Sequence, residues 1–164
     1  MKKRILIGIF SSLFLIVIGL IIVYYSATSS IKKGEEVAVE RAKKEASLAE
    51  VDSVDWFHYL DEYYVIQGKN KKGEKIHIWV PVDEKKEMIV KKATEGLSEK
   101  EVTTLIHKLD NFSSDKRPKN IISIKLAIVE DAPAYEITYK DQKNRHSILY
   151  LDYYKGEWYR VYNL

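Results

Sequence analysis

The side chains that most often bind metals are few in this chain and are poorly spaced for that task. The four histidines are His58, His77, His107 and His146, and no two of them lie four residues apart on a helix. The sequence contains no H-E-x-x-H motif and no cysteine, which excludes that zinc spacing and all thiolate ligands. We therefore predict no metal site and no cofactor.

Paired carboxylates can act together as a general acid and a general base. Such pairs occur at residues 61–62, 83–84 and 130–131, and each pair falls at a predicted turn, where solvated charge is the ordinary arrangement. The composition allows a Ser-His-Asp set, but the G-x-S-x-G motif is absent, and the seven glycines form no phosphate-binding loop. We predict that the protein is not an enzyme.

Aromatic side chains are more informative than the titratable ones. Strands favour aromatic residues, so packing within a sheet is their ordinary role. Trp79 lies between Ile78 and Val80, so its ring points to the opposite face of the strand from their side chains. Tyr150 is placed in the same way between two leucines. Such a ring either joins two halves of the protein or forms a partner surface, and the sequence leaves both interpretations open. The candidate partner-surface residues are Trp79, Tyr150, Tyr153 and Trp158.

Charge is concentrated at the start of the chain. Lys2, Lys3 and Arg4 account for the whole formal net charge of +3, so the remaining residues carry equal numbers of basic and acidic groups. A nucleic-acid partner requires an excess of basic residues on one face, and the composition supplies none. We therefore predict no nucleic-acid binding.

An uncharged apolar segment follows at residues 5–25 and is long enough to span ~30 Å of hydrocarbon as a helix. The basic residues before it predict a cytoplasmic tail at 1–4, with everything after the span outside the cytoplasm. A cleaved signal peptide has a shorter apolar core, of about 7–15 residues, and an A-x-A-like site, which Ser26-Ala27-Thr28 matches poorly. We expect an uncleaved single-pass anchor in the cell membrane, followed by a linker at 26–34.

The most regular pattern beyond the span is a hairpin at residues 62–82. Alternating apolar residues on both sides of Asn70-Lys71-Lys72-Gly73 predict two strands joined by a tight turn. The same pattern recurs 71 residues later, so that Tyr64 aligns with Tyr135 and Gly73 with Asn144. This recurrence indicates an internal duplication.

Each copy reads as a helix followed by about four strands. Ala38, Ala42, Ala46 and Ala49 form a small-residue stripe on a helix predicted at 31–50, which favours close packing on a sheet over a coiled coil. Ser98 and Glu101 form a capping box for a second helix. The predicted fold is α+β, with a transmembrane helix and two helix-plus-antiparallel-sheet repeats at 35–95 and 96–164. The predicted strands are 51–60, 63–67, 75–82, 88–92, 121–129, 134–139, 147–154 and 158–162.

A family resemblance is carried by the segment YYVIQGKNKKGEKIHIWVPVDEKK, followed by EGLSEKE. These residues resemble the TseB-like (YpmB-like) proteins of Bacillus and its relatives, and the basic start, single span, Ala-rich helix and two similar halves match the layout of that family. The resemblance implies an extracytoplasmic pair of cystatin-like, PepSY-related domains. It also implies a role in regulating cell wall elongation through a penicillin-binding transpeptidase, and it brings no catalytic residues.

These observations favour a non-catalytic interaction module that regulates a membrane-bound wall synthase. The resemblance also allows a peptidase inhibitor or a propeptide-like module acting on an exported protease. An enzyme acting on peptidoglycan is a third hypothesis. Binding of an anionic wall polymer or of lipid headgroups by the lysine-rich hairpin tip at 69–75 is a fourth.

Overall fold

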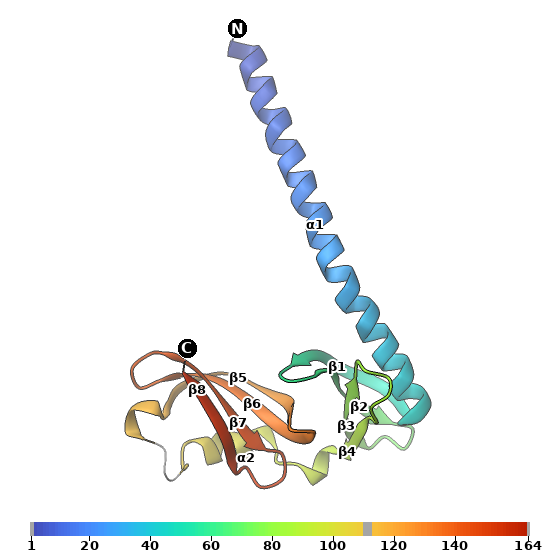
Figure 1. Cartoon of the computed structure of the whole chain (residues 1–164), viewed down its shortest axis with the longest axis vertical. Coiled ribbons are helices and arrows are strands. Elements are labelled where there is room, and N and C mark those ends of the chain that lie inside the picture. The colour runs from blue at the N-terminus through green and yellow to red at the C-terminus, as the bar shows by residue number, and fades with distance from the viewer. Residues whose placement is uncertain (1, 110–112, 164) are drawn as a thin grey trace. The chain divides into compact units, whose positions relative to one another are not determined.

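The structure is a computed structural model that describes residues 2–109 and 113–163. The chain divides into two compact units, residues 1–37 and 38–164. The first unit is helical, and the second contains two four-stranded antiparallel sheets. In Figure 1 the strands of the first sheet run from teal to green and those of the second from orange to red. The predicted α+β class, with an apolar N-terminal helix before two antiparallel sheets, is confirmed.

Helix α1 (Lys2–Glu45) carries the apolar segment. Within the part of the chain whose side chains are described, it is the one helix long and apolar enough to cross a membrane, with a mean hydropathy of 2.1. Length and composition therefore agree with the predicted membrane anchor.

Helix α1 continues without a break through residues 26–34, where the sequence predicts a linker. This segment contains no proline. Serine in a helix interior costs only a few tenths of a kcal/mol relative to alanine. The hydroxyl of Ser29 donates to the carbonyl of Ser26 at 3.0 Å, so this side chain is satisfied within the helix itself. A segment rich in serine thus remains helical because helix flanks it on both sides.

The helix ends at Glu45 rather than at Glu50. Ser47 adopts a left-handed conformation with φ 56°, which turns the chain away from the helix, and Leu48 then enters the core with 2% of its surface exposed. The predicted packing stripe is confirmed for Ala38 and Ala42, which are buried. Ala49, in contrast, is exposed on the first strand, so it lies outside the stripe.

The first sheet has the strand order β1-β2-β3-β4. Its strands are β1 (Leu48–His58), β2 (Glu62–Asn70), β3 (Lys75–Pro81) and β4 (Ile89–Lys92). The Asn70–Gly73 turn forms as predicted, with the Asn70 side chain accepting from the amides of Lys72 and Glu74 and with Gly73 at φ 78°. Arg41 of α1 donates to the carbonyls of Pro81 and Lys86 and so holds the C-terminal end of α1, from Ala38 on, against this sheet.

A short connection leads to the second half. It contains a 3₁₀ turn η1 (Ala93–Glu95) and helix α2 (Glu99–Ile106). The predicted capping box is present, because Ser98 accepts from the Glu101 amide and the Glu101 carboxylate accepts from the Ser98 amide. Val102 and Ile106 are the buried residues of α2, four residues apart on one face of the helix.

The second sheet has the order β5-β6-β7-β8 and follows a 3₁₀ turn, η2 (Ser114–Lys116). Its strands are β5 (Pro118–Val129), β6 (Ala132–Asp141), β7 (His146–Asp152) and β8 (Trp158–Asn163).

The two sheets repeat one another in detail. Register shifts occur in β1 at 48/50 and 51/53, and they recur in β5 at 118/120 and 121/123. Ile66 pairs with Ile78 in the first sheet, and Ile137 pairs with Leu149 at the corresponding point of the second. Bulges at matching positions support the duplication that the sequence indicates, because a bulge is retained within a family of related sheets.

The apolar residues form two clusters. One lies between α1 and the first sheet and includes Ala42, Ile66 and Ile78. The other spans both sheets and α2 and includes Trp79, Val102 and Leu149. Burial of each large aliphatic side chain contributes about 1.5–3 kcal/mol, so the second cluster joins the two halves strongly.

Candidate functional site

Trp79 lies where the two sheets meet. Its ring is completely buried, and its indole N–H donates to the carbonyl of Ala127 on β5 at 2.7 Å. Ile76, Ile78 and Val80 lie in the opposite cluster, against α1, so the predicted alternation of faces is confirmed. Of the two interpretations left open by the sequence, the structure places Trp79 in the contact between the halves. We call this contact the sheet joint, centred on Trp79, Ala127 and Tyr153.

Tyr153 completes the sheet joint and is also completely buried. Its ring makes an edge contact with Trp79, with centroids 5.4 Å apart, and stacks on Tyr135 at 5.5 Å. The ring lies directly against Gly96, where an added Cβ would overlap the ring atoms of Tyr153. Burial raises the pKa of Tyr153, so the phenol stays protonated.

His77 borders the sheet joint on β3. Its Nδ1 lies 2.8 Å from the hydroxyl of Tyr153. Burial lowers the pKa of His77, and the charge of Lys75 lowers it further. The imidazole is therefore neutral near pH 7 and serves as a hydrogen-bonding group rather than as a cation.

Polar contacts also cross between the halves. The hydroxyl of Tyr63 donates to Asp131 at 3.1 Å, and Lys125 pairs with Asp55 at 2.8 Å. The Lys125–Asp55 pair is partly exposed and so adds little stability, but it connects β5 of the second sheet to β1 of the first.

Tyr150 is buried on the second sheet beside a residue of the first half. Its hydroxyl donates to Glu136 at 2.6 Å, and its ring centroid lies 5.4 Å from that of Tyr59. The hydroxyl of Tyr59 lies 2.9 Å from that of Tyr162 and accepts from Arg160. Burial, followed by the bond to Glu136, raises the pKa of Tyr150.

Trp158 differs from the other three candidate residues because it is 43% exposed. It begins β8, an edge strand of the second sheet. Three nearby tyrosines of the same segment are exposed to a similar degree, and with Trp158 we call them the C-terminal aromatic set: Tyr154, Trp158, Tyr159 and Tyr162. Burial and a hydrogen bond to Asp152 raise the pKa of Tyr159 to about 12.

An open groove of about 350 Å³ lies between the two sheets. Its floor comes from the first sheet, where Ser53, Gln67 and His77 pair across β1, β2 and β3. Its walls are residues 124–126 of β5 and residues 97–99 at the start of α2. The sequence does not predict this groove, because the groove depends on how the sheets pack. We call it the inter-sheet groove.

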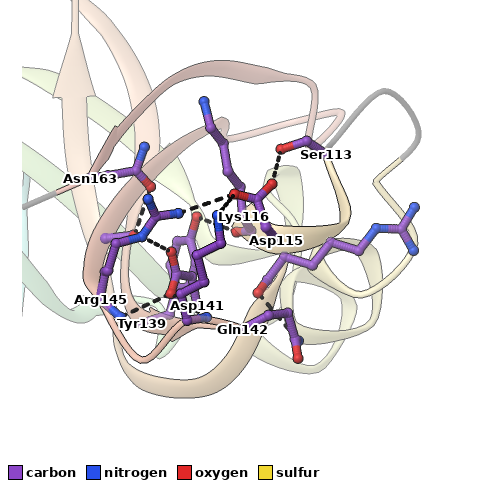
Figure 2. A network of polar contacts seen from close by, with 11 residues as sticks. Ser113, Asp115, Lys116, Tyr139, Asp141, Gln142, Arg145 and Asn163 are labelled. Atoms are coloured by element: carbon purple, nitrogen blue, oxygen red, sulfur yellow. Dashed lines mark hydrogen bonds and ion pairs between the residues drawn. The ribbon is translucent and has the colours of Figure 1, made fainter.

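A polar network at the opposite end of the second sheet fixes the η2 segment to the β6–β7 turn. Figure 2 shows the Arg145 guanidinium between Asp115 and Asp141. The buried carboxylate of Asp141 also accepts from the amides of Lys143 and Arg145. Hydrogen bonds from Ser113 and Lys143 lower the pKa of Asp115 to about 2. The cations neutralise both carboxylates, so the network stabilises the fold and presents no catalytic pair.

The sequence did not predict this network, although it contains one usable signal. Asp141 aligns with Asn70, and both side chains accept from the amides two and four residues later. The two turns differ in the residue four positions later, which is Glu74 after Asn70 and Arg145 after Asp141. Among the described residues, no three His, Cys, Asp or Glu side chains are grouped so as to hold a metal ion.

Comparison with known proteins gives a family. The profile described as "Cell wall elongation regulator TseB-like domain" matches residues 37–81, the span from the end of α1 through β3. A protein of Bacillus subtilis (strain 168), "Probable cell wall elongation regulator TseB", is 35% identical over 135 residues, which cover 82% of this chain and 80% of that protein. The chain belongs to the TseB-like family. The resemblance stated from the hairpin residues is thereby confirmed.

The TseB-like fold is also known from a solved structure. The structure described as "YpmB protein from Bacillus subtilis" superposes with a TM-score of 0.70 and 32% sequence identity. The match covers 79% of this chain and 96% of the solved one. The fold is therefore shared with that solved protein, and the family's description as a regulator suggests a non-catalytic role.

Proposed function

We propose that this TseB-like protein is a single-pass, extracytoplasmic regulator of cell wall elongation that binds the ectodomain of a penicillin-binding transpeptidase. The name of its Bacillus subtilis relative supports the regulatory role. The apolar segment of α1 supports the membrane anchor, and the basic residues before it support a cytoplasmic N-terminus. We further propose that 35–95 and 96–164 are its two repeats.

The proposed interaction is based on the exposure of the C-terminal aromatic set. Trp158 is 43% exposed on an edge strand, and Arg160 lies in the same strand with half of its side chain exposed. Tryptophan, tyrosine and arginine are enriched among the few residues that dominate the binding free energy at protein interfaces. Trp79, Tyr150 and Tyr153 are buried in the unbound chain, so we assign the partner surface to Trp158 and its exposed neighbours.

The test is binding between the full-length chain in detergent and a purified transpeptidase ectodomain, measured by biolayer interferometry. Trp158→Ser is expected to weaken binding at least tenfold, the range typical of an interface hot spot. Trp56→Ser is the matched control, because Trp56 is 47% exposed on β1, an edge strand of the first sheet. Absence of binding by the wild-type chain, or equal losses in both variants, would contradict the proposal.

A further inference from the structure

The inter-sheet groove is the part of the first sheet that the second half leaves uncovered. His77 and Trp79 share one face of β3, and Gln67 and Val65 share that face of β2. Trp79 and Val65 are buried beneath the second half, whereas Gln67 and His77 are only half-buried and line the groove. The groove floor is thus a polar row, Ser53-Gln67-His77, which lies beside the buried Val65 and Trp79 on the same face of the sheet.

One wall of the groove is an edge strand. Among the strands that the structure describes, β5 pairs only with β6, so every second residue of β5 presents backbone N–H and C=O groups away from the ladder. Beyond the end of the groove, Trp79 donates to one backbone carbonyl of β5, that of Ala127. A donor from outside the sheet therefore already contacts the backbone of β5 beside the groove.

The charges of the groove are balanced. Asp52 and Glu99 carry negative charges at the lining, and Lys75 and Lys125 carry positive ones. Lys125 is paired with Asp55, and the low pKa of His77 keeps its imidazole uncharged near pH 7. A groove of this kind has no excess charge with which to attract a polyanion. It does offer many neutral donors and acceptors, which an uncharged backbone can use.

We propose that the inter-sheet groove binds an extended polypeptide segment of a partner protein, which adds as a strand beside β5. Main-chain hydrogen bonds to β5 supply the affinity, and the row of Ser53, Gln67 and His77 selects polar side chains that point to the floor. The volume of about 350 Å³ lies within the range of ligand sites, and the groove is open to solvent rather than enclosed, so a longer segment can extend beyond it. This site shares no residue with the C-terminal aromatic set, so it stands independently of the proposed transpeptidase contact.

The test uses the full-length chain in detergent and a phage-displayed library of linear nine-residue peptides. A peptide selected from the library is synthesised with a fluorophore, and its Kd is measured by fluorescence anisotropy. Ser53→Trp fills the groove and is expected to weaken binding at least tenfold, whereas Gln142→Trp, in the exposed β6–β7 turn, leaves it unchanged. Gln67→Glu, of nearly the same shape, adds a charge to the neutral floor and is expected to weaken binding as well.

A second arm tests strand pairing directly. Peptides N-methylated at alternate positions lose backbone donors on one edge only, so one of the two methylation patterns is expected to abolish binding and the other to preserve it. Urea midpoints of all variants show that the fold is intact. Failure to select any peptide, selection of peptides that bind Ser53→Trp as well as the wild type, or equal tolerance of both methylation patterns would overturn the proposal.

Discussion

The indole N–H of Trp79 donates to the backbone carbonyl of Ala127 at 2.7 Å, and this bond connects β3 of the first sheet to β5 of the second. Both residues are completely buried. A buried carbonyl that loses its partner incurs a desolvation cost, so this bond helps to fix how the two halves pack. The sheet joint in turn determines the shape of the inter-sheet groove.

Removal of the indole should destabilise the protein strongly. Trp79→Phe leaves a cavity and removes one donor to Ala127, for an expected loss of about 2–4 kcal/mol in the free energy of unfolding. Trp56→Phe is the control, because Trp56 is 47% exposed, and its expected effect is within about 0.5 kcal/mol. Urea denaturation of the full chain in detergent measures both, and equal midpoints would show that Trp79 does not hold the joint.

A methyl group at position 96 should disturb Tyr153. The backbone of Gly96 has φ −99° and ψ 171°, which alanine adopts without strain, so the whole cost of Gly96→Ala arises from the clash with the ring. Because Tyr153 is completely buried and cannot move freely, we expect a loss of about 1–3 kcal/mol. In a Tyr153→Leu background the same substitution should cost much less. A cost that is unchanged there would rule out the contact as its cause.

Acidification should weaken the sheet joint through His77. Because its pKa is lower in the folded chain than the ordinary 6.5, the unfolded chain binds the proton first as the pH falls. The contribution of His77 is therefore complete above about pH 6.5 and is lost progressively below it, by at most about 1.4 kcal/mol per pH unit. Wild type should lose more stability than His77→Gln between pH 7.5 and pH 5.5. Equal losses in the two proteins would contradict this assignment.

The duplicated turns offer a matched comparison. Asp141 and Asn70 each accept from two backbone amides, but Asp141 is completely buried and also accepts from Arg145 at 2.7 Å. Asp141→Ala leaves a guanidinium without this partner, so it should lower the urea midpoint more than Asn70→Ala does. The reverse order would show that the network of Figure 2 adds nothing beyond the turn itself.

Local features were predictable because their causes lie within a few residues. The Asn70–Gly73 turn follows from side-chain acceptance and a positive φ, and its copy follows at Asp141 and Asn144, where φ is 59°. The capping box at Ser98 forms for the same kind of reason. The helix through residues 26–30 was not predicted, because serine content alone does not break a helix whose flanks are helical.

Features that depend on packing between distant segments could not be predicted. Alternation along β3 places Trp79 opposite Ile78, but only the structure shows that β5 covers that face. Tyr150 and Tyr153 were likewise candidates for a surface, and their burial results from contacts with Tyr59 and His77, which lie far away in the sequence. The inter-sheet groove arises from the same packing, so no local motif indicates it.

The most direct test of the proposed regulator places a photo-reactive amino acid at Trp158 and, in a second strain, at Trp56, in the native membrane. After irradiation, adducts are purified and probed with a fluorescent penicillin. We predict an adduct between position 158 and a penicillin-binding protein, and none from position 56. An adduct from position 56 alone, or no penicillin-labelled adduct from position 158 at normal expression, would contradict the assignment of the partner surface to β8.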